Sequence, residues 1–459
     1  MRLRPAKIAL CLLATLAALP AAESPRPNVV VMLVDDLGWG DVSALHRGEV
    51  NTPNIDRLAQ TGVKFTSGYA TAPLCGPARA GFFSGVYPQR FGFVDNLGGI
   101  PTTQPLLPGV LHDAGYRTAL LGKWHSAGPM PHERGVFDET LCSHLSSPFI
   151  DYHHPKLARN GKVEVHDTYS TDLFAREAVE FIERNQANPF YLTVTFNAPH
   201  ILRVVKNAQL IQKEYDAAVA EGKILDVPKV PMARPGDAEK YSGQFPGDGA
   251  RADTVATIVA LDEAVGRILD KIKSVGLDRR TLIFFFGDNG GHPENRSNSL
   301  PLRDYKWSLY EGGIRVPFLA AYPGVFPAGL SYDHPVSTLD LFPTIAALTG
   351  VKAPASLDGV NLTPYLQGAK TGAPHDTLYF SIGGLGAVRQ GKWKLVLSPT
   401  GVPALFDLAR DFEEKKDLAS LEPDRVKELT SQWKTWNRGM PAPVRPAAKG
   451  GQAAGKKSE

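Results

Sequence analysis

A cysteine, a proline and an arginine occupy alternate positions near the end of the segment Thr-Ala-Pro-Leu-Cys-Gly-Pro-Ala-Arg, residues 71–79. Pro77 suits the first turn of a helix, because its φ angle is fixed and its missing N–H would be unpaired there anyway. Cys75 would then lie at a helix N-terminus, where unpaired backbone N–H groups favour negative charge. Arg79, about one turn further on, lies on the same helix face. A single cysteine is more often a buried core residue, so the neighbouring motifs must decide between the two roles.

Two pairs of oxygen-bearing side chains follow apolar runs elsewhere in the chain. Asp35-Asp36 follows one run and Asp288-Asn289 follows another. Carboxylate and amide oxygens suit a hard cation, Ca²⁺ or Mg²⁺, rather than zinc. Each pair alone could form an ordinary turn, but both together beside Cys75 predict a metal site. Successive strand residues point to opposite faces, so Asp35 and Asp36 can share a metal only if the strand ends there.

Two lysines and two histidines complete the set of candidate reactive residues. Lys123 and His125 belong to a Gly-Lys-Trp-His segment, His200 ends an Asn-Ala-Pro-His segment, and Lys306 precedes Leu-Tyr-Glu-Gly-Gly-Ile-Arg-Val-Pro. Taken singly, each lysine would be a solvated surface charge and His200 a structural histidine. Lys123, His125 and His200 closely follow apolar runs, which favours a role for them beside the predicted acids.

Four apolar runs position these residues. They cover residues 29–34, 117–121, 190–196 and 281–286, and each ends in one of the polar clusters. Unbroken apolar runs of this length are typical of strands buried on both faces, and helical patterns at 106–114, 171–185 and 252–274 lie between them. The alternation predicts an α/β fold with a large, mostly parallel sheet covered by helices on both faces. Ligands bind beyond the carboxyl ends of such strands, so we expect all four clusters on one rim.

The C-terminal part of the chain has a different pattern. Short strand-like segments at 378–381, 387–389, 393–396 and 404–406 precede a helical pattern at 422–436. They predict a small antiparallel sheet with one helix. We therefore expect a catalytic domain over residues 23–370, a small subdomain over 371–440 and a disordered tail over 441–459. Periodicity fails over 201–249, which predicts an irregular excursion above the site.

The N-terminus predicts export. Three basic residues precede an apolar run at 8–19 and a small-residue segment at 20–22, which is typical of a signal peptide over residues 1–22. We expect a periplasmic or secreted protein without a membrane span. A net charge of +3 and the lack of a long basic run disfavour nucleic-acid binding. Removing the signal leaves Cys75 and Cys142, which could pair in an oxidising compartment.

The Cys-x-Pro-x-Arg pattern at 75–79 resembles the maturation motif of the type I sulfatases, which belong to the alkaline phosphatase-like superfamily. The segments 122–125 and 301–317 resemble further motifs of the family, and the resemblance runs from residue 27 to residue 418. The chain also departs from the family. Ser126-Ala127 replaces the usual Leu-Gly, Val136-Phe137-Asp138 replaces Gly-Phe-Asp, and residues 140–152 match poorly, which leaves the substrate subsites unassigned.

This resemblance implies a modified nucleophile and a metal. Cys75 would be oxidised to formylglycine by a maturation enzyme, which would leave Cys142 as a lone thiol. The resemblance implies Ca²⁺ as the cation, and the sequence does not separate it from Mg²⁺. Its ligands would be Asp35, Asp36, the modified Cys75, Asp288 and Asn289.

The resemblance also implies roles for the remaining residues. Lys123 and Lys306 would bind the sulfate oxygens, and His200, helped by Lys306, would bind the substrate and protonate the departing alcohol oxygen. His125 would be the base that drives sulfate release, and Arg79 would hold the formylglycine hydrate.

The function that this implies is an exported sulfuric ester hydrolase acting on a sulfated carbohydrate. The loops at the expected rim carry cations and aromatics suited to anionic sugars: His132, Arg134, His144, Tyr152, His153, His154, Arg203 and Lys206. A phosphodiesterase or phosphonate monoester hydrolase of the same superfamily is the first alternative, and a catalytically inactive glycan-binding protein is the second. The intact Cys-x-Pro-x-Arg pattern with a single visible set of metal ligands favours the sulfatase.

Overall fold

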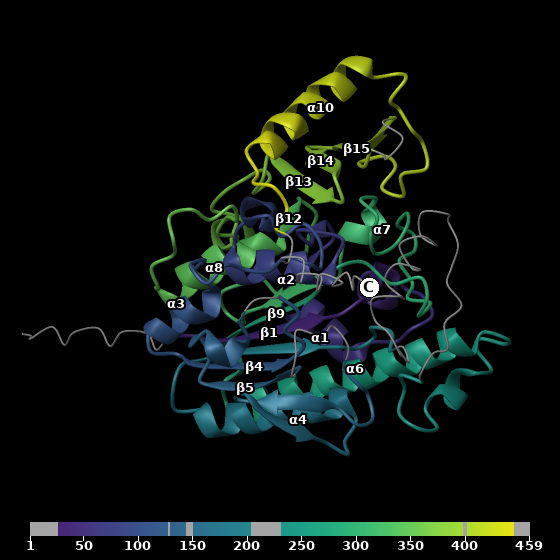
Figure 1. Cartoon of the computed structure of the whole chain (residues 1–459). Helices are drawn as coiled ribbons and strands as arrows, with labels where there is room; N and C mark the ends of the chain where they lie inside the picture. The colour runs from purple at the N-terminus through teal and green to yellow at the C-terminus, as the bar shows by residue number, and fades with distance from the viewer. Residues whose placement is uncertain (1–25, 127–128, 144–149, 203–230, 398–401, 445–459) are drawn as a thin grey trace, which may run out of the picture.

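A ten-stranded sheet runs through the middle of the chain's larger part (Figure 1). The computed structural model describes residues 26–126, 129–143, 150–202, 231–397 and 402–444. The predicted signal peptide and most of the predicted tail lie outside these residues. The strand order is β11-β2-β10-β9-β1-β8-β4-β5-β6-β7, and β10 and β6 run opposite to the others. The strands are β1 (Asn28–Val34), β2 (Val63–Phe65), β4 (Arg117–Gly122), β5 (Glu139–Ser143), β6 (Lys156–Arg159), β7 (Lys162–Val165), β8 (Phe190–Phe196), β9 (Thr281–Gly287), β10 (Phe318–Ala321) and β11 (Leu330–Tyr332).

The four predicted strands form the centre of this sheet. They are β1, β4, β8 and β9, and β1 pairs in parallel with both β8 and β9. Every residue of β1, β8 and β9 is buried. Val30 and Met32 of β1 belong to the hydrophobic cluster on one face, whereas Val29 and Val31 belong to the cluster on the other. Side chains alternate between faces along a strand, so the unbroken apolar run follows from burial on both faces, as predicted.

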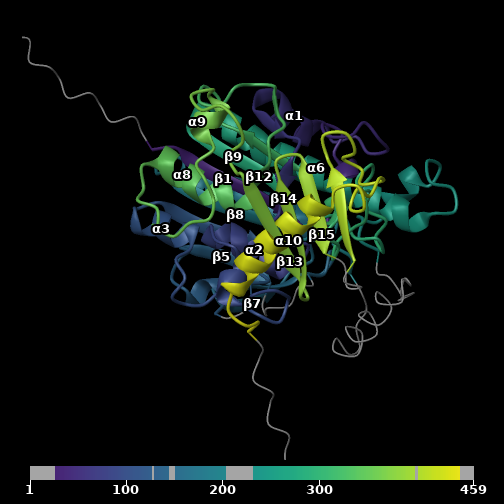
Figure 2. The ribbon, with the colours of Figure 1, turned by 90° about the horizontal axis from the view of Figure 1, so that it is seen from above.

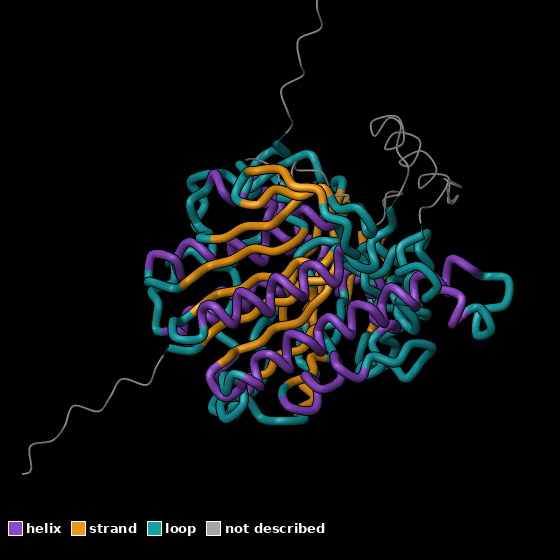
Figure 3. Tube along the Cα trace, turned by 90° about the horizontal axis from the view of Figure 1, so that it is seen from below, coloured by secondary structure: helices purple, strands orange, loops and turns teal. Residues whose placement is uncertain are grey.

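Helices cover both faces of the sheet. On one face lie α1 (Pro53–Thr61), α4 (Ser170–Asn185) and α6 (Gly249–Ser274), of which the two long helices lie over the strands (Figure 3). On the other face lie α2 (Cys75–Ser84), α3 (Leu107–Asp113), α8 (Leu341–Thr349) and α9 (Thr363–Leu366). The three predicted helices are confirmed with small shifts at their ends. In the described part of the chain, no helix combines the length and the apolar composition needed to cross a membrane.

The edges of the large sheet were not predicted. Strands β2, β10 and β11 on one side and β5, β6 and β7 on the other have three to five residues each. Such short segments give too few alternations for a periodicity signal. Of the predicted irregular excursion at 201–249, the described part after residue 230 contains turns and a 3-10 helix at Ala238–Tyr241 before α6 begins.

A second, four-stranded antiparallel sheet lies above the first. It consists of β13 (Thr377–Ile382), β14 (Leu385–Gln390), β15 (Trp393–Leu397) and β16 (Pro403–Asp407), and α10 (Pro423–Arg438) crosses its outer face (Figure 2). The predicted small sheet and its helix are therefore confirmed, and the exact domain limits stay a prediction. The inner face packs on β3 (Gly68–Tyr69), on α7 (Glu311–Ile314) and on the segment just before α7.

Candidate active site

The carboxyl ends of four adjacent central strands carry the predicted polar clusters. Strand β1 ends at Val34, and Asp36 then has a φ of 61°, so the chain turns and both aspartates face one place. Because the strand ends before Asp35, Asp35 and Asp36 can bind the same metal ion. Ligand atoms of Asp35, Asp36, Cys75 and Asp288 all lie within 4.8 Å of one another.

Cys75 is the first residue of α2, where the sequence predicted a helix to begin. Its Sγ lies 3.4 Å from Oδ1 of Asp35 and 3.0 Å from Nζ of Lys306, and the residue is 1% exposed. Burial, with the Asp35 charge beside it, raises the pKa of the Cys75 thiol far above its usual range. The helix N-terminus does not overcome this, so the unmodified thiol stays protonated and is a poor nucleophile.

Arg79 is fully buried and its guanidinium binds the acids. Its Nε and Nη2 donate to Oδ2 of Asp288 at 3.0 and 2.9 Å, and Nη2 also lies 3.2 Å from Oδ2 of Asp35. The remaining nitrogen, Nη1, donates to the Lys123 carbonyl at 2.7 Å. The guanidinium therefore orients the acids and the Lys123 backbone rather than contacting Cys75.

Two lysines from separate segments approach the aspartates, Lys123 directly after β4 and Lys306 between β9 and α7. Lys123 forms an ion pair with Asp35, and Nζ of Lys306 lies 2.6 Å from Oδ1 of Asp36. Lys123 is 0% and Lys306 6% exposed, so neither is a solvated surface lysine. Burial alone would raise the pKa of Asp35, but Lys123, His200 and Arg79 together hold that pKa well below its usual range.

Two oxygen atoms in this cluster are buried without a hydrogen-bond partner among the described residues. They are Oδ2 of Asp36 and Oδ1 of Asn289. The Asn289 amide donates from Nδ2 to Oδ1 of Asp36 at 2.8 Å. Burial and the Asp35 charge also raise the pKa of Asp288 to about 7. Buried polar atoms are nearly always paired, so orphaned oxygens beside crowded carboxylates form a donor set that fits a hard cation.

Both predicted histidines lie at this rim. Nδ1 of His200 is 2.8 Å from the Ile201 carbonyl, so it donates there, and Nε2 lies 3.7 Å from Oδ2 of Asp36. His125 has a φ of 47°, and in the described part of the chain its buried Nδ1 has no hydrogen-bond partner. Burial and the Lys123 charge lower the pKa of both imidazoles well below their usual range.

The structure also shows supporting residues that the sequence analysis did not single out. His292 is 3% exposed, packs edge-on against Trp307 at 4.6 Å between ring centroids, and accepts a hydrogen bond from the backbone of Glu294. Ser297 donates at 2.8 Å to the Asp36 carbonyl and so supports its left-handed turn. The sequence carries a signal for His292, because this residue ends the run Asp-Asn-Gly-Gly-His that begins with two predicted metal ligands. It carries no comparable signal for Ser297.

The loop residues predicted to bind the substrate differ in their burial and in their contacts. Tyr152 is fully buried, and its hydroxyl donates to the carbonyls of His200 and Asn197 at 2.9 and 3.0 Å. The prediction for Tyr152 is therefore wrong, because the side chain supports the His200 loop from beneath. His153 and His154 contact Pro231 and Asp167, and His132 packs against the Gly161 turn. His144, Arg203 and Lys206 lie outside the described residues.

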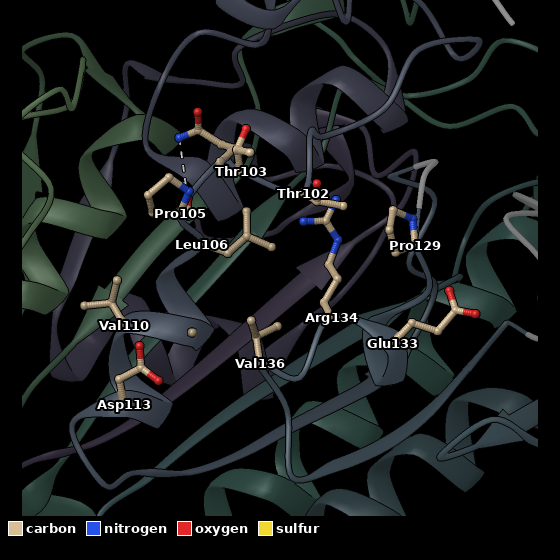
Figure 4. A pocket seen from close by; sticks show the side chains of 12 residues that line it. Thr102, Thr103, Pro105, Leu106, Val110, Asp113, Pro129, Glu133, Arg134 and Val136 are labelled. Atoms are coloured by element: carbon tan, nitrogen blue, oxygen red, sulfur yellow. Dashed lines mark hydrogen bonds between the residues drawn. The ribbon is translucent and has the colours of Figure 1, made fainter.

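Arg134 lines a cavity of about 340 Å³ between α3 and the segment around residues 129–136 (Figure 4). Its guanidinium binds the Ile100 carbonyl and lies 6.0 Å from the Trp124 ring. Asp113 and Glu133 line the same cavity. Arg134 thus connects the cavity to Trp124, and the mixed charges of the cavity do not mark it as an anion site.

Comparison with known protein families gives two matches. The family model described as sulfatase matches residues 27–351, and the model described as N-sulphoglucosamine sulphohydrolase, C-terminal, matches residues 303–435. The chain is 31% identical over 426 residues to arylsulfatase A of Bos taurus, covering 83% of this chain and 76% of the relative. It is 30% identical over 436 residues to N-acetylgalactosamine-6-sulfatase of Rattus norvegicus, covering 85% and 75%.

A solved structure shows the same architecture. The crystal structure of Ps i-CgsB in complex with k-i-k-neocarrahexaose superposes with a TM-score of 0.81 at 29% identity. The alignment covers 92% of this chain and 95% of that one.

Proposed function

Because this chain belongs to the sulfatase family and hydrolyses sulfate esters, we propose that it is an exported enzyme that desulfates a carbohydrate, using a formylglycine made from Cys75. The observation that carries the proposal is the convergence of Cys75, three buried acids and three buried cations at the carboxyl rim of the sheet. The sugar substrate is supported by the names of two relatives, an N-acetylgalactosamine-6-sulfatase and a protein crystallised with a hexaose.

A calcium ion fits the oxygen donors of this cluster. Asp35, Asp36, Asp288 and Asn289 would hold it together with the modified residue at position 75, and Mg²⁺ suits the same oxygens. When bound, the ion supplies Lewis acidity that lowers the pKa of a nearby hydroxyl. When all three acids are ionised, they balance Arg79, Lys123 and Lys306 in charge. A divalent cation would give the site the net positive charge that an anionic sulfate ester requires.

The nucleophile would be the hydrated formylglycine. Its two hydroxyls would stand on the Cβ atom near the place that Sγ of Cys75 marks, within reach of Lys306 and Asp35. One hydroxyl would lose its proton to water, and its alkoxide oxygen would form a bond to sulfur while the bond between sulfur and the sugar oxygen breaks. The electron pair of that bond goes to the sugar oxygen, which then requires a proton.

His200 would supply that proton from Nε2, since Nδ1 is committed to the Ile201 carbonyl. Its lowered pKa makes the imidazolium a strong acid but reduces the protonated fraction. The Asp36 carboxylate at 3.7 Å and the incoming sulfate both favour the protonated form. Lys123 and Lys306 would bind the sulfate oxygens, which carry negative charge throughout the reaction.

Release would use the second hydroxyl. His125 takes its proton, the carbonyl of formylglycine re-forms, and the bond between carbon and the sulfate oxygen breaks with its electron pair leaving on sulfate. Water then regenerates the hydrate. Arg79 would contribute through Asp35, Asp288 and the Lys123 carbonyl, which it holds in place.

The first test compares reaction types. The purified protein from a maturation-competent host is assayed for bound calcium, for the aldehyde mass at position 75, and for turnover of an aryl sulfate and an aryl phosphodiester. We expect calcium, the aldehyde and sulfate ester hydrolysis. Preferential phosphodiester cleavage, with an unmodified Cys75, would favour the phosphodiesterase alternative.

Two further measurements test the substrate and the location. A panel of defined sulfated saccharides should contain a substrate, and turnover of steroid or lipid sulfates alone would refute the carbohydrate proposal. Expression of the full chain with a marker for each compartment should give a periplasmic or secreted protein that begins after residue 22. Retention in the cytoplasm with an intact N-terminus would refute export.

A further inference from the structure

A second group of buried charges lies where the small sheet meets the large domain. Lys394 of β15 and Glu414, which follows β16, are both 0% exposed. Nζ of Lys394 lies 2.8 Å from Oε1 of Glu311 and 3.0 Å from Oε1 of Glu414. The second distance is an ion contact rather than an aligned hydrogen bond. Lys394 occupies a strand position that faces the catalytic domain, where an alternating pattern would place an apolar residue.

Glu311 is the centre of this group. Its Oε2 accepts hydrogen bonds from Tyr69 at 2.8 Å and from Arg315 at 3.2 Å, while Lys394 donates to its Oε1. The backbone N–H of Glu311 donates to Oε2 of Glu414 at 2.6 Å. The small subdomain thus holds both the side chain and the backbone of the first residue of α7.

The residues after Glu311 lie against the two loops of the active site. A Cβ atom on Gly312 would lie 2.1 Å from the Asp304 carbonyl oxygen, and one on Gly290 would lie 1.8 Å from the Gly312 carbonyl oxygen. The N–H of Gly312 donates to the Arg303 carbonyl at 2.7 Å. Gly290 directly follows Asn289, and the turn that begins at Arg303 leads to Lys306. A shift of α7 therefore cannot leave Lys306 and the metal-binding loop in place, because packed backbones transmit displacement.

The small subdomain also binds the Lys306 turn directly. Nη1 of Arg303 donates to the Glu414 carbonyl at 3.1 Å, and the Arg303 guanidinium lies 3.8 Å above the Tyr310 ring, which packs against Phe406 of β16. One apolar cluster joins the inner face of the small sheet to this segment: Tyr69, Leu309, Ile314, Leu378, Phe380, Ala387, Val396, Phe406 and Leu408.

We propose that Lys394 and Glu414 are positioning residues for catalysis, which act through Glu311 and α7 to place the Lys306 ammonium beside residue 75. The C-terminal subdomain would then be a working part of the active site. This inference rests on the proposed function of Lys306 in binding sulfate. A merely structural role predicts lower stability with unchanged kinetics of the folded protein, so the test must separate these outcomes.

The test is a double-mutant cycle between Lys394→Met and Lys306→Ala, with turnover of an aryl sulfate as the readout. Methionine keeps a long apolar side chain but removes the charge. We expect Lys394→Met to lower kcat/KM about 10–100-fold, as misplacement of a reacting group does. In the Lys306→Ala background the same change should lower kcat/KM by much less, because only the path through the metal-binding loop remains. All rates are normalised to the fraction of protein that is folded and carries the aldehyde.

The matched control is Lys392→Met, which removes another ion pair of the same hairpin, that with Asp407 at 2.7 Å. It should leave kcat/KM within about twofold of wild type, because surface substitutions away from buried networks and functional sites have small effects. Full activity of Lys394→Met, or an equal loss in both backgrounds, would overturn the inference. Wild-type activity of Lys306→Ala would instead overturn the proposed role of Lys306, and this inference with it.

A second variant covers the case in which Lys394→Met does not fold. Glu414→Gln keeps the shape and an acceptor for the Glu311 N–H but removes the charge that ionised Glu414 places beside Lys394, so the rates are compared at about pH 8, above the raised pKa of Glu414. It should lower kcat/KM several-fold, and by less in the Lys306→Ala background. Unchanged kcat/KM in folded Glu414→Gln would overturn the role of Glu414.

Discussion

Two buried charge groups in this protein differ in how completely their atoms are paired. In the rim group, Asp36 and Asn289 each keep an oxygen without a hydrogen-bond partner among the described residues, and three acids crowd together. In the group under the small sheet, both carboxylate oxygens of Glu311 accept hydrogen bonds from side chains. The first group is poorly satisfied by the protein alone, whereas the second is largely satisfied.

This difference distinguishes a charge group that is suited to binding a ligand from one that is suited to holding neighbouring elements in place. Orphaned polar atoms and crowded like charges cost stability, and a fold keeps them where function requires them. A satisfied buried network fixes one arrangement of the elements around it. Changes in the rim group should therefore affect chemistry and metal binding more than folding, and changes in the second group should affect folding and geometry together.

The largest expected effect is at the nucleophile. Cys75→Ser keeps a hydroxyl of similar size, so the protein should fold and bind calcium. Serine sulfate has no second hydroxyl for release, so we expect at most one turnover and a rate loss of about 1,000-fold or more. Intact mass spectrometry should show one added sulfo group.

The control for that variant is Cys142→Ser, at the other buried cysteine of the described chain. It should cost stability because a hydroxyl enters the core, while the aldehyde at position 75 and the activity of the folded fraction remain. Undiminished multiple turnover by Cys75→Ser would contradict the formylglycine mechanism.

The next effect distinguishes acid catalysis from binding. His200→Ala should lower hydrolysis of a sugar sulfate by about 100–10,000-fold, and hydrolysis of an activated aryl sulfate by much less, because a good leaving group needs no proton. Steady-state rates on both esters measure this ratio. His112→Ala on α3 is the control and should change neither rate. Equal losses on both esters would show that His200 binds or positions the substrate instead.

Metal binding gives a thermodynamic test of the rim group. Calcium should raise the stability of the wild type by about 2.7 kcal/mol at 100 times its Kd. Asp36→Asn should lose this increase, yet unfold in a chelator at nearly the wild-type temperature, because crowding with Asp35 is relieved as the Lys306 ion pair is lost. Calorimetry with and without calcium measures both.

Asp262→Asn is the matched control for that experiment. Asp262 is a buried acid that accepts hydrogen bonds from the backbone at the start of α1, at 3.0 and 2.8 Å. Its replacement should lower the stability with and without calcium equally. A full calcium shift in Asp36→Asn would remove Asp36 from the ligand set.

The smallest expected effect is a change in how the stability of the protein depends on pH. It arises from Glu414 in the charge group under the small sheet. Burial raises the pKa of Glu414 to about 7, although Lys394 opposes the shift. The folded protein then holds this proton between about pH 4.5 and 7 while the unfolded chain has lost it. Stability relative to Glu414→Gln should therefore be greatest below about pH 4.5 and fall by about 1–3 kcal/mol as the pH rises to 7.

Urea unfolding in a chelator at several pH values measures this difference. Glu413→Gln, at the neighbouring and more exposed residue, should reproduce the wild-type pH dependence. A difference between wild type and Glu414→Gln that stays constant from pH 4.5 to 7 would show that Glu414 is already ionised across this range.

The central sheet and the set of rim residues could be predicted from the sequence. The run at 29–34 is apolar at every position, and the runs at 190–196 and 281–286 contain threonine as their only non-apolar residue type, because both faces of the strands are buried. Parallel pairing then brings the residues after each strand to one edge. Pro77 similarly placed Cys75 at the start of a helix. These features depend on the residue types within short segments, which can be read directly from the sequence.

Side-chain contacts between distant segments were decided by tertiary structure. Nothing near Arg79 indicates that it binds Asp288 rather than residue 75, and nothing near Tyr152 indicates that it lies beneath His200. Lys394 lies 83 residues from Glu311 along the chain, in a strand too short to show that its charged face is buried. Such contacts depend on how sheets and loops pack against one another, and the hydrophobic pattern that drives packing does not specify which polar groups meet.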